Sequence, residues 1–228
     1  MNFIVDLNWP VDYWLKLKQR DVYLTPMNKL FKLPANYSIS LLVISLITIF
    51  AISSAISFPV LSLEHIKVAD GEVWRLFTGN FVHFGWAHTL MNLAAFFLCA
   101  IAILNSLSIK QYVSLILFCC ITVGVGVYYL NPEYETYAGL SGAIHGFIVA
   151  GLMLNKRHNA WINGVLVLLL FGKIFHEHQT HYQANDLQAL LPVPVAYDAH
   201  LYGALAGLVF GGIELGRQWF NNKQLQKN

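Results

Sequence analysis

The stretch Gly139-Leu140-Ser141-Gly142-Ala143-Ile144-His145-Gly146 opens an apolar segment of helix length and places a serine and a histidine inside it. Polar side chains at depth in an apolar segment are costly, so their presence indicates a functional site. Gly-x-Ser-Gly alone is a weak pattern, because a chain with 16 glycines can supply it by chance. A later apolar segment carries a second polar residue, His200. Ser141 and His200 are the minimum parts of a nucleophile–base pair.

Composition indicates a membrane protein. Of the 228 residues, 57% are hydrophobic and only 11% are charged, whereas soluble domains carry about 25% charged residues. The net charge of +2 comes without a basic run interleaved with aromatic residues, so no nucleic-acid partner is expected. The three cysteines all fall in apolar stretches without a CxxC motif, and we expect them to be buried as small hydrophobes: Cys99, Cys119 and Cys120.

Apolar segments predict an all-α membrane protein with six transmembrane helices. A spanning helix needs about 20 apolar residues, and shorter ones suit positions sheltered by protein. The six segments lie near Ser38–Phe58, Gly85–Leu107, Gln111–Leu130, Leu140–Leu154, Ala160–Phe175 and Ala199–Arg217. We therefore predict an N-terminal segment over 1–37, a six-helix domain over 38–220 and a C-terminal tail over 221–228.

The N-terminal segment has two open interpretations. Trp9, Tyr13, Trp14 and Leu17 could form the apolar face of a short interfacial helix. A loosely ordered tail that leads to the membrane is the alternative.

The positions of basic residues predict the orientation. Lys and Arg accumulate in cytoplasmic loops, and the segment before the first span, the turns after the second and fourth spans and the C-terminal tail are basic. The opposite side is rich in acidic residues. Both termini are therefore expected in the cytoplasm, with Ser141 and His200 entering the membrane from the outer side.

Glycines at intervals of four predict close helix packing. Gly203, Gly207 and Gly211 make a small-xxx-small stripe on the last span, and Gly142 and Gly146 have the same spacing on the fourth. Such a stripe would let the backbone around His200 approach Ser141.

Two further polar residues lie near the outer end of the second span. His88 and Asn92 are four residues apart, so on a helix they share one face. Both can donate hydrogen bonds and could converge on a developing oxyanion. The alternative is an ordinary hydrogen bond between helices.

Taken together, Trp74-Arg75, His88-xxx-Asn92, Gly139-x-Ser141-Gly142 and His200-xx-Gly203-xxx-Gly207 resemble the rhomboid intramembrane serine proteases, over roughly residues 71–212. The resemblance implies a dyad without an acidic third member, with Ser141 as nucleophile and His200 as base. It implies an oxyanion site from His88, Asn92 and the backbone N–H of Ser141. It also places Trp74 and Arg75 in a loop partly within the outer leaflet.

The chain also resembles the rhombosortase branch, through Gly-Leu-Ser-Gly-x-x-His-Gly, the run from Phe81 to His88 and Asp198-Ala199-His200-Leu201. This implies a bacterial inner-membrane enzyme that processes Gly-Gly-type C-terminal tails of membrane-anchored exported proteins. No cofactor and no metal are expected.

Three other polar features carry interpretations of their own. His145 stands where most rhomboids have tyrosine, and it could stack on His200 or donate a hydrogen bond that alters its basicity. Asp198 is two residues from His200, so on a helix it would face away and could orient His200 only in a non-helical segment. The cluster His176, Glu177, His178 and His181 could bind a metal, but we expect a solvated outer loop.

These residues predict peptide-bond cleavage within the membrane, in transmembrane or C-terminal anchor segments of exported proteins. A general rhomboid protease with other single-span substrates is the alternative. A non-catalytic client-binding protein would be expected to lack Ser141 or His200, and a proton-coupled transporter would need paired carboxylates within the spans, where only Glu214 is a candidate.

Overall fold

In the computed structural model, the described residues are 35–156, 159–182 and 190–226. The predicted interfacial helix with Trp9, Tyr13, Trp14 and Leu17 lies outside these residues.

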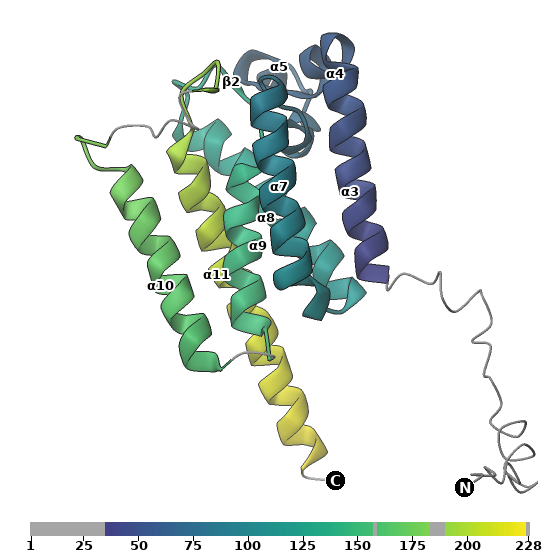
Figure 1. The fold of residues 1–228 in the computed structure, drawn as a ribbon, viewed down its shortest axis with the longest axis vertical. Coiled ribbons are helices and arrows are strands. Elements are labelled where there is room, and N and C mark those ends of the chain that lie inside the picture. Colours follow the sequence, from purple (N-terminus) through teal and green to yellow (C-terminus); the bar gives the residue numbers. More distant parts are fainter. Residues whose placement is uncertain (1–34, 157–158, 183–189, 227–228) are drawn as a thin grey trace, which may run out of the picture. The chain divides into compact units, whose positions relative to one another are not determined.

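The described chain forms a bundle of long helices joined at one end by short elements (Figure 1). The long helices are α3 (Ala35–Ile52), α7 (Trp86–Ala102), α8 (Ile109–Leu130), α9 (Ser141–Leu154), α10 (Ala160–Glu177) and α11 (Tyr197–Leu225). In the described ranges, four helical segments are long and apolar enough to cross a membrane: Trp86–Ser106, Ile109–Leu130, Ala160–Glu177 and Tyr197–Leu225. The chain is therefore a multi-pass membrane protein.

The first predicted span is bent rather than straight. α3 and α4 (Ser54–Leu61) meet at 109° after a break, so they make a fifth span only if the two count as one. Only Ser53 separates them, and α4 contains Pro59, which cannot donate a backbone hydrogen bond. The sequence pattern showed a continuous apolar run here, and apolar runs do not reveal such a bend.

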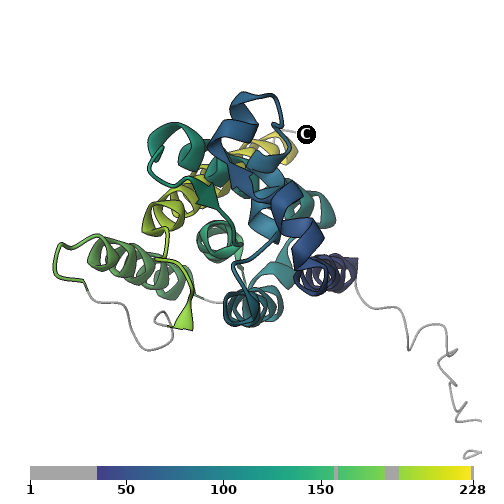
Figure 2. The same cartoon turned by 90° about the horizontal axis from the view of Figure 1, so that it is seen from above.

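The fourth predicted span, α9, has only 14 residues, fewer than the roughly 20 that a lone spanning helix needs. It lies in the middle of the bundle, ringed by the other helices (Figure 2). Every residue of α9 is buried except Ser141, Ile148 and Met153. Neighbouring helices therefore shelter this short helix, as its length and its small residues predict.

Local sequence signals set where some helices begin. α8 follows a capping box, in which the Ser108 hydroxyl accepts from the Gln111 N–H and the Gln111 side chain accepts from the Ser108 N–H. α10 begins after Asn159, whose side chain accepts from the Trp161 N–H at 3.0 Å. α11 runs to Leu225 and so continues past residue 220, where we placed the end of the six-helix domain.

Short elements between α4 and α7 pack over one end of the bundle. They are β1 (Leu63–Glu64), α5 (His65–Ala69), α6 (Arg75–Thr78) and the 3-10 helix η1 (Gly79–Phe81); a second 3-10 helix, η2 (Leu104–Ser106), follows α7. β1 pairs antiparallel with β2 (Thr136–Tyr137), with Leu63 opposite Tyr137. Because β2 ends four residues before Ser141, this pairing ties the short elements to the start of α9.

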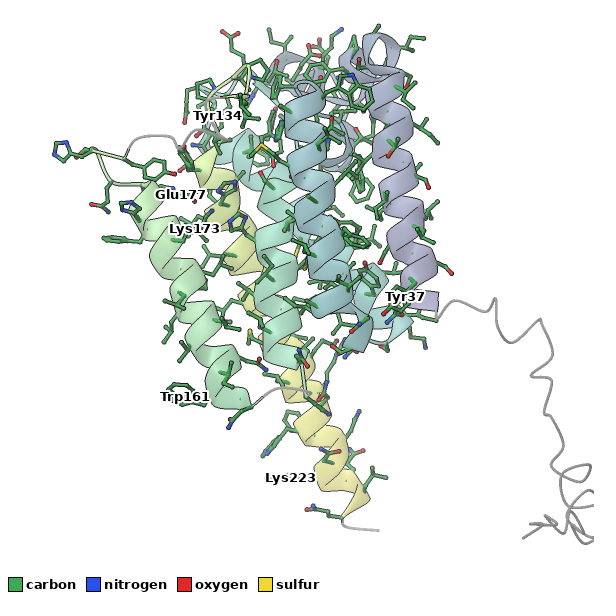
Figure 3. All side chains as sticks on the ribbon, in the orientation of Figure 1. Tyr37, Tyr134, Trp161, Lys173, Glu177 and Lys223 are labelled. Atoms are coloured by element: carbon green, nitrogen blue, oxygen red, sulfur yellow. The ribbon has the colours of Figure 1, made fainter. Side chains whose placement is uncertain are left out.

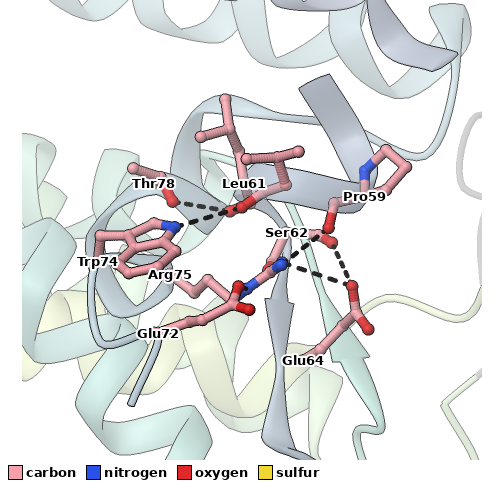
Figure 4. Close-up of polar contacts among 9 residues, drawn as sticks. Pro59, Leu61, Ser62, Glu64, Glu72, Trp74, Arg75 and Thr78 are labelled. Atoms are coloured by element: carbon pink, nitrogen blue, oxygen red, sulfur yellow. Dashed lines mark hydrogen bonds and ion pairs between the residues drawn. The ribbon is translucent and has the colours of Figure 1, made fainter. Parts of the chain in front are cut away.

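A buried arginine holds these short elements together (Figure 4). Arg75 is 2% exposed. Its Nη1 donates to Ser62 O at 2.6 Å, its Nη2 to Pro59 O at 2.8 Å and its Nε to Glu72 Oε2 at 2.7 Å. The planar guanidinium thus satisfies donors in three directions, which permits burial of its charge.

Glycines bring α9 and α11 into backbone contact. A Cβ added to Gly142 would lie 2.8 Å from Ala199 O, and one added to Gly146 would lie 2.5 Å from Gly203 O. A Cβ on Gly203 would collide with Gly142 O. The close packing predicted from the glycine stripe is therefore confirmed, and it brings the starts of both helices together.

The main core fills the space between α3, α7, α8, α9 and α11. Its largest fully buried side chains include Phe96, Tyr112, Leu115 and Phe147. The three cysteines are buried and free, as predicted.

Candidate active site

Ser141 is the first residue of α9, and a glycine sets the turn that leads to it. Gly139 has φ +131°, a conformation that L side chains rarely adopt. A Cβ there would also lie 2.6 Å from the His88 ring. Gly139 N–H donates to Gly79 O at 3.0 Å, and Tyr137 Oη donates to Gly139 O at 2.9 Å. The turn is therefore held on both sides, and the first N–H groups of α9 have no acceptor within the helix.

His200 lies in the first turn of α11 and faces Ser141. The distance from His200 Nε2 to Ser141 Oγ is 3.1 Å. His200 is 4% exposed, whereas Ser141 is half-buried. Residues 59 positions apart are thus within hydrogen-bond reach.

The other nitrogen of the same ring meets a carboxylate. His200 Nδ1 lies 3.1 Å from Glu177 Oε2, and Glu177 is the last residue of α10. Glu177 is 4% exposed, so its assignment to a solvated loop is wrong; His176, His178 and His181 are exposed, as expected. The sequence does contain a signal for this position. Lys173 lies four residues before Glu177, and an opposite-charge pair at this spacing shares one face of a helix, which predicts that the helix continues to Glu177.

Lys173 joins Glu177 to His145. Lys173 Nζ lies 2.8 Å from Glu177 Oε1 and 3.0 Å from His145 Nε2. Figure 3 shows the Lys173 and Glu177 side chains reaching from α10 toward the bundle. His145 Nδ1 lies 2.7 Å from Ser141 O. The rings of His145 and His200 stack, with centroids 4.1 Å apart and 18° between their planes.

Asp198 does not contact His200. Its Oδ2 accepts from Tyr134 Oη at 2.6 Å, and its Oδ1 lies 3.4 Å from His178 Nε2. Burial and the Asp198 carboxylate raise the pKa of Tyr134 far above its usual value, so the phenol remains a donor. Asp198 is helical, and as expected for a helix it faces away from His200.

These groups line one cavity of about 750 Å³. Its polar lining includes His88, Asn92, Ser141, His145, Lys173, Glu177 and His200. Much of the remaining wall is apolar, with Phe84, Met91, Ile144, Val193 and Pro194. A mostly apolar cavity with a few converging polar groups is typical of a binding or catalytic site.

The sequence pattern of the Rhomboid domain matches residues 70–217, which hold every residue of this cavity. The chain belongs to the rhomboid family. It is 27% identical over 150 residues to the "Putative rhomboid protease YdcA" of Bacillus subtilis (strain 168), covering 64% of this chain and 69% of that protein. It is 29% identical over 153 residues to the "Rhomboid-related protein 1" of Caenorhabditis elegans, covering 64% of this chain but only 41% of that protein.

In this rhomboid, His88 and Asn92 lie on α7 and line the cavity with Ser141. The Asn92 amide donates to His88 O at 3.0 Å, and His88 Nδ1 is buried with no hydrogen-bond partner among the described residues. The His88 ring stacks on Phe84 and meets His83 edge-on. Burial and the neighbouring His88 lower the pKa of His83 to about 3.

Trp74 and Arg75 of this rhomboid do not line the cavity. Arg75 makes the contacts described above, and Trp74 Nε1 donates to Val60 O at 3.3 Å. Their contacts hold the loop between α4 and α7, away from Ser141.

Three cavity residues could in principle hold a metal ion. Donor atoms of His145, Glu177 and His200 lie within 4.8 Å of one another, and two imidazoles with a carboxylate suit zinc. The Lys173 ammonium, however, contacts both Glu177 and His145. A cation already neutralises this set, so the donors fit a metal poorly.

Proposed function

We propose that this rhomboid is an intramembrane serine endopeptidase with Ser141 as nucleophile and His200 as general base. The observation that carries the proposal is the 3.1 Å contact between Ser141 Oγ and His200 Nε2 in a cavity of substrate size. An adjacent base is what a serine hydroxyl needs to become a nucleophile at neutral pH.

In the proposed reaction, His200 Nε2 takes the proton of Ser141 Oγ as Oγ attacks the scissile carbonyl. The oxyanion accepts hydrogen bonds from the Ser141 N–H at the start of α9 and from His88 and Asn92. Loss of one such donor commonly lowers the rate by about 10²–10³. The C–N bond then breaks, His200 gives its proton to the leaving nitrogen, and water hydrolyses the acyl-enzyme.

The remaining site residues support this geometry in the proposal. Gly139 shapes the turn against His88, and Gly142 and Gly203 let α9 and α11 touch. His145 stacks on the base. Trp74 and Arg75 hold the loop over one end of the bundle.

For the substrate, we propose Gly-Gly-type C-terminal tails of exported proteins, as in rhombosortases, in a bacterial inner membrane. The support is the Gly-Leu-Ser-Gly-x-x-His-Gly motif and the His145–His200 stack that it produces. Six spans, cytoplasmic termini and a cavity that opens outward belong to this proposal. Small residues at the cut would help a substrate helix to unwind. The family match alone would equally suit a general rhomboid protease with other single-span substrates.

A fluorophosphonate serine probe tests the chemistry. The purified wild type should be labelled at Ser141, and Ser141→Ala and His200→Ala should lose the label. Ser53→Ala is a matched control, because Ser53 Oγ donates to Ile49 O of α3 and Ser53 does not line the cavity. Labelling that persists in Ser141→Ala would exclude Ser141 as the nucleophile, and an unlabelled wild type would favour a client-binding role.

A second experiment tests the substrate class. Exported proteins from cells carrying Ser141→Ala should keep C-terminal tails that are absent from cells with the wild-type chain. Identical tails in both strains would favour a general rhomboid activity.

A further inference from the structure

Side chains from three helices meet at His200. His200 on α11 contacts Ser141 of α9 through Nε2 and Glu177 of α10 through Nδ1, each at 3.1 Å. A histidine with a hydroxyl at one nitrogen and a carboxylate at the other has the arrangement of a Ser–His–acid triad. The resemblance to rhomboids implies a dyad, so Glu177 has no role in the function proposed above.

The carboxylate decides which nitrogen of His200 carries the hydrogen. An ionised carboxylate can only accept, so the atom that faces Glu177 Oε2 must be Nδ1–H. Neutral imidazole has one N–H, which leaves the Nε2 lone pair directed at Ser141 Oγ. Glu177 thereby holds His200 in the tautomer that can act as a base.

Lys173 makes an ionised Glu177 tolerable at 4% exposure. A buried carboxylate is costly unless it is paired. Glu177 Oε1 is 2.8 Å from Lys173 Nζ, which leaves Oε2 for His200. Each carboxylate oxygen therefore has its own partner, and the pair at i and i+4 fixes the direction of the carboxylate.

The same lysine orders His145. Its ammonium can only donate, so His145 Nε2 accepts and His145 Nδ1 carries the hydrogen, which is donated to Ser141 O at 2.7 Å. The stacked rings of His145 and His200 thus have defined and matching protonation. One chain of contacts runs from the Ser141 backbone through His145, Lys173, Glu177 and His200 to the Ser141 side chain, with an ion pair between Lys173 and Glu177 and hydrogen bonds at the other steps.

We propose that Glu177 is the third member of a Ser141–His200–Glu177 triad, as a positioning residue that fixes the His200 tautomer and balances the imidazolium. The inference rests on the proposed protease activity. When the Ser141 proton moves to His200 Nε2 and the Oγ–carbon bond forms, the Nδ1 hydrogen stays on the ring and Glu177 stays ionised. As the C–N bond breaks, the Nε2 proton leaves with the amine, and the starting charges return.

The rival explanation is that Glu177 and Lys173 only pin α10 to the bundle. The two roles differ in what a replacement acid can restore. A triad member acts through the ring of His200 and should affect the labelling step itself. A pinning residue should affect folding and probe binding, and an added small carboxylate should not compensate for it.

The rate of fluorophosphonate labelling of the purified full chain tests this. Glu177→Gln should lower the maximal labelling rate constant by roughly 10⁴-fold, the size of effect seen when a triad acid is replaced. The probe concentration that gives half the maximal rate should stay within about twofold, because the probe does not need Glu177 for binding. Sodium formate should restore part of the rate of Glu177→Ala, by supplying a carboxylate to the vacated space.

Glu214→Gln is the matched control. Glu214 is a partly buried carboxylate on α11 that bonds to Gln111 and Arg217, outside the cavity. This variant should label at the wild-type rate. Thermal unfolding of both Gln variants shows whether a slow rate comes from a lost fold.

The outcomes separate the two proposals. If the wild type is not labelled at Ser141, the protease proposal and the triad fall together. If the wild type is labelled and folded Glu177→Gln labels at the same rate, only the triad is overturned. Should Glu177→Gln not fold, Glu177→Asp keeps the charge but withdraws the carboxylate by one methylene, and wild-type labelling by that variant would overturn the triad.

Discussion

His145 and His200 stack with ring centroids 4.1 Å apart, and His145 is tied to the backbone of Ser141 as well. One residue thus contacts both members of the proposed nucleophile–base pair. His145 lies on α9 one turn after Ser141, on the same face of the helix. From that position its ring packs against the ring of His200. His145 is therefore part of the candidate site rather than of the surrounding core.

Stacking and hydrogen bonding by His145 can be separated. His145→Phe keeps an aromatic face, and we expect it to retain more activity than His145→Ala. Aromatic pairs contribute about 0.5–1.5 kcal/mol beyond buried area, so Ala should label up to roughly tenfold more slowly than Phe. Rates of probe labelling in the two variants provide the test, and equal rates would show that the stack does not position His200.

Gly203→Ala should push α9 and α11 apart, because the new methyl group would meet the backbone of Gly142. Overpacking of this kind costs about 1–3 kcal/mol, and here it would also separate Ser141 from His200. We expect a lower unfolding temperature in detergent and little labelling. Gly212→Ala on the same helix meets nothing within 4 Å and serves as the control. A Gly203→Ala protein as stable and as active as Gly212→Ala would contradict the close contact.

Lys173→Met should destabilise the fold, because it leaves the buried Glu177 carboxylate without its ion pair. Breaking a buried pair costs about 3–5 kcal/mol, but the Lys173 side chain is 48% exposed, so roughly 1–3 kcal/mol is expected. Thermal unfolding measures the loss. Lys110→Met, at an exposed position in the first turn of α8, should change little. Similar unfolding temperatures for both variants would mean that Lys173 does not stabilise Glu177.

Arg75→Lys should destabilise the loop between α4 and α7. One ammonium cannot replace a guanidinium that donates to Ser62 O, Pro59 O and Glu72 together. The buried acceptors left unpaired cost about 1–3 kcal/mol each, so we expect a loss of at least about 2 kcal/mol. Arg217→Lys, at an exposed ion pair on α11, is the control. Equal unfolding temperatures for the two variants would contradict the role of Arg75 in holding this loop.

Acid should destabilise the protein through His83. Its pKa is lowered to about 3 in the folded chain from an ordinary 6.5. Between these pH values the unfolded chain binds a proton at His83 that the folded chain does not bind. The contribution of His83 to the free energy of unfolding is therefore fully present above pH 6.5 and is lost as the pH drops toward 3. The slope from this one group reaches about 1.4 kcal/mol per pH unit. Unfolding temperatures at pH 7, 5 and 4 should fall less steeply in His83→Gln than in the wild type, and parallel curves would contradict this assignment.

Sequence alone determined what depends on local pattern and composition. Few charges and long apolar runs placed the chain in a membrane, and glycines at intervals of four predicted the contact between α9 and α11. The Gly-x-Ser-Gly motif and the later histidine predicted Ser141 and His200 as the nucleophile and the base. The sequence shows these features because they depend only on residue spacing within a single helix and on side-chain size.

Tertiary structure alone decided which acid meets His200. Asp198 is two residues away in sequence but faces Tyr134 and His178, whereas Glu177 is 23 residues away and contacts the ring. That choice depends on how the end of α10 sits against the start of α11, which no periodicity records. The contacts through which Arg75 holds the loop between α4 and α7 also join separated residues. The bend between α3 and α4 was likewise revealed only by the structure. A sequence shows which side chains are available, but hydrogen-bond partners over long separations are set only when the helices pack.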